Sequence, residues 1–231
     1  MPIQAIIFDC DGTLVDSERV GNAVLIECAE ELGLSLTLET ALEHFAGRKM
    51  ADTISLIEQW LGVPVPDSFL PTVRTRMAHA FEERLEAMAG VHALLKSLAI
   101  PICVASNGPQ EKMQVSLRVT GLLEYFSGRV FSAYDCGSWK PEPGLFLHAA
   151  KTMGVAPEAC AVVEDSPLGI RAAMAAGMTA FGYAPDGDGV SLSREGATVF
   201  HHMDALRGLL KALDGDRIRP TVAAGIARNI L

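Results

Sequence analysis

Long apolar segments are absent from this sequence of 231 residues. No uninterrupted apolar run approaches the roughly 20 residues that a helix needs to cross a bilayer. The first apolar run, residues 3–8, stops at Asp9 and has no basic segment before it, so it lacks the pattern of a secretory signal peptide. We therefore expect a cytoplasmic protein that does not contact membranes.

Cysteine is scarce and shows no pairing pattern. The chain has 5 cysteines, which are widely spaced and include no Cys-x-x-Cys pair. This spacing indicates neither a disulfide framework nor a zinc-binding motif. We expect small buried side chains in a protein from a reducing compartment. The cysteines are Cys10, Cys28, Cys103, Cys136 and Cys160.

Positively charged residues are fewer than negatively charged ones. The chain carries 19 Lys and Arg residues against 28 Asp and Glu residues, which gives a formal net charge of −9. This balance provides no general basic surface for nucleic acid or an anionic membrane, so neither is expected as a partner. Any site for an anionic ligand must be built locally, from particular Lys, Arg or backbone N–H groups. The composition, 49% hydrophobic and 20% charged, is that of a globular chain.

Short apolar runs alternate with helical patterns through most of the chain. Each run is bounded by glycine, proline or charged residues, as expected of strands that are buried on both faces. The alternation predicts an α/β fold with a doubly wound, Rossmann-like parallel sheet. Strands are expected over residues 5–8, 102–105, 130–131, 161–163, 179–182 and 198–200, and helices over residues 91–99, 110–120, 144–153, 168–176 and 203–213.

Residues 16–87 interrupt this alternation. They contain no strand pattern, and helices are predicted over residues 18–32, 38–45, 51–61 and 69–86. We interpret residues 16–87 as a helical cap domain, inserted into a core formed by residues 1–15 and 88–231. Residues 214–231 could form an extra helix or contact a second subunit, so the sequence leaves monomer and homodimer open.

Two aspartates follow the first predicted strand, in the segment Asp9-Cys10-Asp11-Gly12-Thr13. Residues two apart in an extended chain project to the same side, so both carboxylates would face the carboxyl end of the strand, where open α/β sheets bind ligands. Neighbouring carboxylates repel each other, and a magnesium ion, which prefers oxygen ligands, would relieve that repulsion. Gly12 permits a tight turn. The alternative is an acidic turn that only ends the strand.

Polar residues also follow three later strands. Ser106 and Asn107 precede a helix, where hydroxyl, amide and backbone N–H groups can hold phosphate oxygens, although helix capping is the alternative. Lys140 lies in a proline-rich, stiff loop suited to delivering a point charge, although most lysines are solvated. Glu164 and Asp165 could hold a metal, with helix capping by Asp165 or the following serine as the alternative.

In this order, the Asp-x-Asp-Gly-Thr, Ser-Asn, Lys-Pro and Glu-Asp segments resemble the four motifs of the haloacid dehalogenase superfamily. The resemblance extends from Ile6 to about Gly182, and the helical insert resembles that family's cap. It implies a magnesium-dependent phosphatase acting on a small phosphorylated metabolite. Dehalogenases proper lack an acidic residue two positions after the nucleophile, so the presence of Asp11 argues against dehalogenation.

The resemblance also implies roles for individual residues. Asp9 would be the nucleophile that forms an aspartyl-phosphate, and Asp11 would protonate the leaving oxygen and then activate water. Ser106, Asn107 and Lys140 would hold the transferring group. The implied magnesium ligands are the Asp9 side chain, the Asp11 backbone carbonyl and Asp165, with Glu164 nearby or bound through water.

The cap is expected to select the substrate. Its basic residues Arg48 and Lys49 could contact a carboxylate or hydroxyls, although a solvated turn is equally compatible with them. Residues 103–109, 112–114 and 139–141 resemble bacterial 6-phosphogluconate phosphatases, in a group that also contains β-phosphoglucomutase. A histidine in the first cap helix of that mutase corresponds to Gly21, which cannot transfer a proton. A sugar-phosphate or sugar-acid phosphatase is therefore favoured, with a phosphosugar mutase or an inactive binding protein as alternatives.

Overall fold

The computed structural model describes residues 2–45 and 50–215, and its centre is a six-stranded parallel sheet. The strand order is β3-β2-β1-β4-β5-β6. The chain therefore builds outward from β1 on one side and then on the other, which makes β1 and β4 neighbours at the point where the winding reverses. The strands are β1 (Ala5–Phe8), β2 (Ile102–Ser106), β3 (Val130–Ser132), β4 (Cys160–Glu164), β5 (Thr179–Tyr183) and β6 (Thr198–Phe200).

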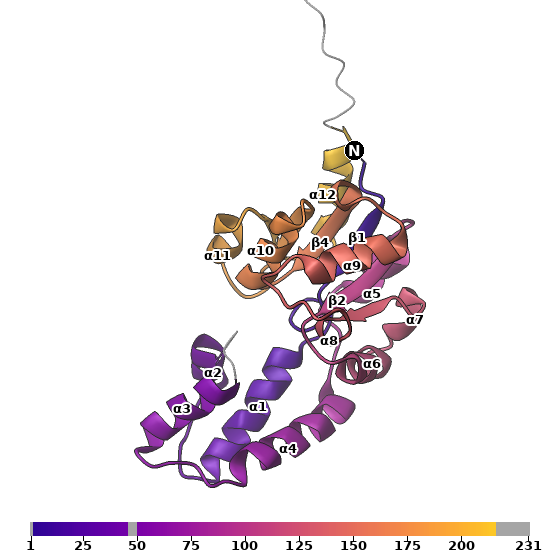
Figure 1. Cartoon of the computed structure of the whole chain (residues 1–231). Coiled ribbons are helices and arrows are strands. Elements are labelled where there is room, and N and C mark those ends of the chain that lie inside the picture. Colours follow the sequence, from indigo (N-terminus) through magenta and orange to yellow (C-terminus); the bar gives the residue numbers. More distant parts are fainter. Residues whose placement is uncertain (1, 46–49, 216–231) are drawn as a thin grey trace, which may run out of the picture.

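Helices cover both faces of the sheet (Figure 1). In β1, Ile6 and Phe8 join one buried cluster, whereas Ala5 and Ile7 join the other. The first cluster includes side chains from α5 (Val91–Ser97), α6 (Gln110–Val119), α7 (Leu123–Phe126) and α12 (Ala205–Gly215). The second includes side chains from α8 (Ala133–Cys136), α9 (Gly144–Met153), α10 (Pro167–Ala175) and α11 (Val190–Arg194), and a 3₁₀ turn, Pro157–Ala159, precedes β4. This arrangement confirms the predicted fold class.

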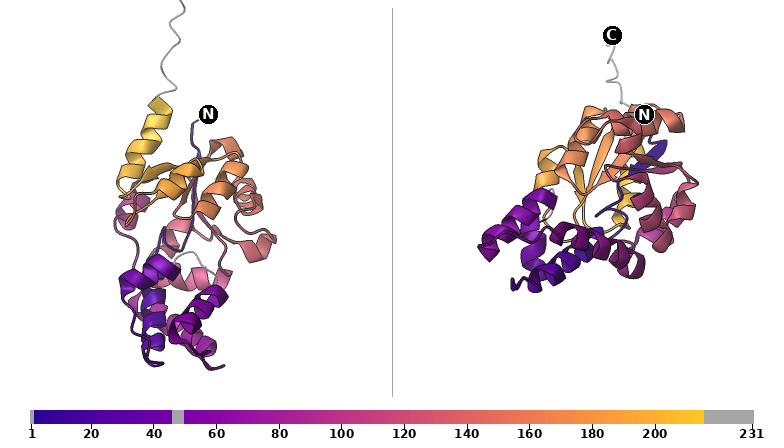
Figure 2. Two further views of the ribbon diagram at one scale, coloured as in Figure 1. Left: turned by 90° about the vertical axis from the view of Figure 1, so that its left-hand side faces the viewer. Right: turned by 60° about the horizontal axis from the view of Figure 1, so that its bottom comes forward.

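Helices α1–α4, which follow β1 and precede α5 along the chain, form a group of their own beside the sheet (Figures 1 and 2). Their facing sides make a separate hydrophobic cluster, in which Leu25, Cys28, Ile57 and Val73 are buried. No strand was predicted in this part of the chain, and none occurs in its described residues. The helices are α1 (Ser17–Glu30), α2 (Leu38–Phe45), α3 (Met50–Leu61) and α4 (Phe69–Arg84).

Two neighbouring segments connect this helical group to the sheet. The Asp16 N–H donates to the Glu86 carbonyl at 3.0 Å, and the Met88 N–H donates to the Leu14 carbonyl at 2.9 Å. The outgoing and returning chains therefore run side by side, with an antiparallel bridge between Val15 and residue 87. Both pass just beyond the carboxyl end of β1, so the helical group is attached beside the predicted ligand-binding edge of the sheet.

The described residues include no helix that is both long enough and apolar enough to cross a membrane. The five cysteines are free, and four of them are buried, in agreement with the expectation of small apolar side chains.

Candidate active site

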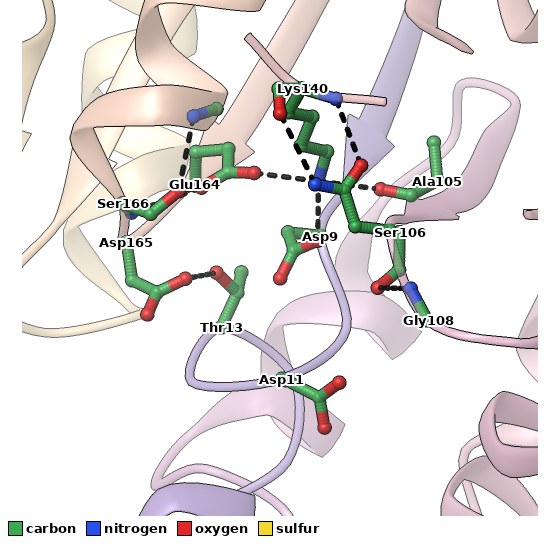
Figure 3. Close-up of polar contacts among 12 residues, drawn as sticks. Asp9, Asp11, Thr13, Ala105, Ser106, Gly108, Lys140, Glu164, Asp165 and Ser166 are labelled. Carbon is green, nitrogen blue, oxygen red and sulfur yellow. Dashed lines mark hydrogen bonds and ion pairs between the residues drawn. The ribbon is translucent and has the colours of Figure 1, made fainter. Parts of the chain in front are cut away.

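A buried lysine lies at the centre of the predicted site (Figure 3). The Lys140 ammonium donates to the carboxylate of Asp9, to Glu164 Oε1 at 2.6 Å and to the Ala105 carbonyl at 2.9 Å. Each of its three N–H groups thus has an acceptor, as a buried charge requires. The loop that carries Lys140 therefore meets the carboxyl ends of β1, β2 and β4, where the sequence predicted the site.

Burial and crowding shift the ionisation of these groups. Burial raises the pKa of Asp9 to about 7, while Lys140 acts in the opposite direction and Glu164 adds to the rise. Burial also raises the pKa of Asp165 well above its ordinary value, with further contributions from Glu164 and Asp9. Burial opposes the charge of Lys140, but the two carboxylates beside it outweigh that effect and raise its pKa. The cluster therefore favours a proton or a cation that offsets its negative charge.

The same carboxylates form a set that fits a divalent cation. One oxygen from each of Asp9, Glu164 and Asp165 lies within 4.8 Å of the others. Thr13 orients Asp165, because its hydroxyl donates to Asp165 Oδ1 at 2.9 Å. A side chain at Gly12 would approach Asp165 Oδ2 to 2.2 Å, and the residue has a φ of +77°, so this close turn requires glycine. Hard oxygen donors in this arrangement suit magnesium.

Glu164 is held between two loops. Besides the bond from Lys140 to Oε1, its Oε2 accepts from the Ser166 N–H at 3.0 Å and from the Ser166 hydroxyl at 2.8 Å. Ser166 also caps α10, because its hydroxyl oxygen accepts from the Gly169 N–H at 3.0 Å. The capping that the sequence analysis left open thus occurs, and it fixes an acidic residue of the site at the same time.

Asp11 lies apart from the other carboxylates in Figure 3. Its Oδ2 accepts from Lys112 Nζ, on α6, at 2.9 Å, whereas its Oδ1 is buried and has no hydrogen-bond partner among the described residues. Burial opposes the charge of Lys112, but Asp11 outweighs this effect and raises the pKa of Lys112. Lys112 was assigned no role from the sequence and counted only toward the resemblance to 6-phosphogluconate phosphatases. Its place in the first turn after the Ser106–Asn107 loop is the signal that could have identified it.

The Ser106–Asn107 loop meets the Lys140 loop. Asn107 Oδ1 accepts from the Lys140 N–H at 2.9 Å, and Asn107 Nδ2 donates to the Lys140 carbonyl at 3.3 Å. Ser106 is buried, and its hydroxyl oxygen accepts from the Gly108 N–H at 3.2 Å. The amide of Asn107 thus joins the two loops. The contact of Asn107 with phosphate remains a prediction. Because its amide is bonded to the Lys140 loop, the backbone N–H of Asn107 would make that contact.

A pocket of about 290 Å³ opens beside Gly12 and Asp165. It lies between the helical group, which contributes residues of α1 and α2, and the loop that follows β5. Arg19 of α1 spans this space, because its Nη2 is 2.9 Å from Asp186 Oδ2 in that loop. Carboxylates dominate the charged lining, which consists of Asp16, Glu18, Arg19, Asp165, Asp186 and Asp188.

The predicted substrate-selecting residues Arg48 and Lys49 lie outside the described residues. They belong to the segment between α2 and α3, and Leu42 of α2 lines the pocket. Their contact with substrate remains a prediction.

A family model for haloacid dehalogenase-like hydrolases matches residues 3–177. The chain belongs to this family. The match includes every predicted catalytic and metal-binding residue at the carboxyl ends of the strands. The predicted family is thus confirmed, and the sheet with its inserted helices is the haloacid dehalogenase-like fold.

Several known proteins resemble the chain over nearly its whole length. The 6-phosphogluconate phosphatase of Escherichia coli K12 is 38% identical over 93% of this chain and 97% of its own. A HAD family hydrolase of Deinococcus radiodurans, solved with bound phosphate and sodium, is 33% identical with a TM-score of 0.83, covering 92% of this chain and 97% of its own. A putative β-phosphoglucomutase of Thermotoga maritima is 27% identical with a TM-score of 0.78, covering 91% and 100%. The predicted enzyme class, a hydrolase of phosphoric monoesters, is confirmed at this level.

Proposed function

We propose that this hydrolase is a magnesium-dependent phosphatase for a small phosphorylated carbohydrate or sugar acid, with 6-phosphogluconate as the first candidate. The observation that carries the proposal is the position of Asp9, at the carboxyl end of β1 and in contact with the Lys140 ammonium. The name of the Escherichia coli relative supports the choice of first substrate.

The proposed reaction has two displacements at phosphorus. In the first, a carboxylate oxygen of Asp9 attacks phosphorus, the bond from phosphorus to the sugar oxygen breaks, and Asp11 gives that oxygen a proton. In the second, water loses a proton to Asp11 and attacks the same phosphorus. The bond to Asp9 then breaks, inorganic phosphate leaves, and both aspartates return to their starting states.

The groups around Asp9 would stabilise the charge that develops on the transferring phosphoryl group. Lys140 brings a positive charge to Asp9, and the Ser106 hydroxyl with nearby N–H groups would donate hydrogen bonds. Magnesium, held by the Asp9 and Asp165 carboxylates and the Asp11 carbonyl beside Glu164, would supply further positive charge. These donors are fixed in the folded chain, so little reorganisation is needed when substrate binds.

Residues 16–87 would act as a cap over this site. The pocket beside Asp165 is bounded by α1, α2 and the loop after β5, so it could receive the part of the substrate that is not phosphate. Its volume of about 290 Å³ suits a small metabolite rather than a phosphoprotein surface.

The test is phosphate release from a panel of sugar phosphates, sugar-acid phosphates and nucleotides, with magnesium and with a chelator. We expect release that requires magnesium and that Asp9→Asn abolishes. The matched control is Asp135→Asn, which neutralises an exposed aspartate on α8 and should leave turnover unchanged. Full turnover by Asp9→Asn would remove the assignment of Asp9 as nucleophile.

The same panel separates the phosphatase from a phosphosugar mutase. A mutase would return an isomeric sugar phosphate and release little inorganic phosphate. Gly21, at the position of the mutase histidine, is buried in α1, and a side chain there would meet Met77 of α4 at 3.6 Å. The position therefore offers no proton donor, which supports the phosphatase.

A further inference from the structure

We propose that Lys112 is a positioning residue for Asp11, which ties the orientation of that carboxylate to the packing of α4 against the core. The proposal rests on the phosphatase function above. Lys112 would act through Asp11 and would not touch the substrate.

The two carboxylate oxygens of Asp11 have different surroundings. Oδ2 is held by the Lys112 ammonium at 2.9 Å, whereas Oδ1 is buried without a hydrogen-bond partner among the described residues. An aspartate side chain rotates easily, and a charge-assisted bond to one oxygen restricts that rotation. With Oδ2 held, Oδ1 would be the oxygen that exchanges a proton with the leaving oxygen and later with water.

Lys112 also contacts the helical group. Its Nζ lies 5.5 Å from the centre of the Phe81 ring, on α4, while the backbone of Lys112 belongs to α6 of the core. A cation this close to an aromatic face is attracted to it. The ammonium therefore lies between Asp11, α6 and α4, and a movement of α4 would alter the contact that holds Asp11.

A purely structural ion pair is the competing interpretation. The side chains of Lys112 and Asp11 are 39% and 28% exposed, so solvent screens their attraction, and its loss should change the stability of the fold little. A positioning role predicts a different pattern, in which catalysis falls while stability is nearly unchanged.

The experiment compares two substrates that differ in their need for a proton. A sugar phosphate has an alkoxide leaving group that must be protonated, whereas p-nitrophenyl phosphate releases a stable anion. The measured quantity is kcat/KM, because it covers the steps up to loss of the leaving group and excludes the later attack of water. For Lys112→Met we expect kcat/KM for the sugar phosphate to fall about 10- to 100-fold, because a misplaced Asp11 loses part of the rate enhancement that a general acid provides. The value for p-nitrophenyl phosphate should fall less than about 3-fold, because the general acid is not needed.

Two further variants define the role. Lys112→Arg keeps a cation within reach of Asp11 and should recover part of the loss. In an Asp11→Asn background, Lys112→Met should have no additional effect on the sugar phosphate, because two residues that act through one group are not additive. The matched control is Lys151→Met, which removes an exposed lysine from α9 and should leave both substrates unaffected.

The outcomes separate this inference from the proposed function. Equal losses on both substrates, additive effects in the Asp11→Asn background, or no loss at all would overturn the role of Lys112 while the phosphatase function stands. If the wild-type protein releases no phosphate from either substrate, the proposed function fails and the role of Lys112 falls with it.

Discussion

Gly169 has no side chain at a place where the carboxylate of Glu164 fills the available space. A Cβ atom at this position would lie 1.9 Å from Glu164, which is only 1% exposed and cannot move into solvent. Because Glu164 accepts from Lys140, a displaced Glu164 would also release the lysine that contacts Asp9. One glycine in α10 thus maintains the spacing of the site.

We expect Gly169→Ala to lower kcat for phosphate release at least about 10-fold and to destabilise the fold by about 1–3 kcal/mol, as overpacking does. The measurements are phosphate release under saturating magnesium and unfolding in urea. Gly208→Ala is the matched control, because Gly208 is also helical and no atom would meet its Cβ. That variant should keep its activity and gain up to about 1 kcal/mol from better helix propensity. Normal activity of Gly169→Ala would contradict the role given to Glu164.

The acidic residues and Lys140 could be proposed from the sequence, because the acidic residues follow buried strands and Lys140 lies in a stiff, proline-rich loop. The sequence could not identify the partner of Asn107, since the Lys140 backbone is 33 residues away and only the folded chain brings the two loops together. Lys112 was missed for the same reason, since its contact with Asp11 joins residues 101 positions apart. The place of Lys112 in the first turn of α6 was a local signal, but its contact with Asp11 is fixed only by tertiary packing.

Helix α10 begins directly after the acidic residues Glu164, at the end of β4, and Asp165. Ser166 supplies its N-cap and two hydrogen bonds to Glu164, so the start of the helix and the geometry of the site depend on one hydroxyl-bearing residue. An N-cap serine satisfies a backbone donor that the helix itself cannot pair.

We expect Ser166→Ala to lower the free energy of unfolding by about 1 kcal/mol through loss of the cap. Phosphate release should also slow, because Glu164 Oε2 loses one of its two donors. Ser68→Ala is the control, since Ser68 is the N-cap residue of α4 but makes no side-chain capping bond. Chemical denaturation measures the stability of both variants, and turnover assays measure their phosphate release. Equal losses of stability in Ser166→Ala and Ser68→Ala would argue against the capping role of Ser166.

The predicted strands all occur, each within a residue or so of its expected bounds, because parallel strands buried on both faces are short apolar runs with clear limits. The helices α7, α8 and α11 were not predicted. Each has only 4 or 5 residues, too few to show a helical period. That residues 16–87 act as a cap stays a prediction.

For the whole molecule, the acidic cluster links stability to pH. The Asp9 carboxyl has a pKa of about 7 in the folded chain against its ordinary 3.8, so the folded protein binds this proton more tightly than the unfolded chain does. The contribution of this protonated carboxyl to the stability of the fold is complete below pH 3.8 and is lost as the pH rises through about 7. Magnesium should restore stability above that range, because it binds the deprotonated carboxylates.

We therefore expect added magnesium to raise the thermal midpoint more at pH 8 than at pH 5. Thermal unfolding in chelator and in magnesium, over a series of pH values, measures this difference. In Asp9→Asn the dependence of the magnesium effect on pH should flatten, because the titrating carboxyl is gone. A magnesium effect that is independent of pH in the wild-type protein would contradict the assignment.

The acidic lining of the pocket beside Asp165 has a consequence for how substrate arrives. Asp16, Glu18, Asp186 and Asp188 line this pocket together with Arg19, and the chain as a whole carries a net charge of −9, so we expect a phosphorylated anion to be repelled during its approach. Many enzymes attract anionic substrates from a distance and lose that advantage as ionic strength increases. We expect the reverse here: at saturating magnesium, moderate salt should screen the repulsion and speed the encounter of enzyme and substrate.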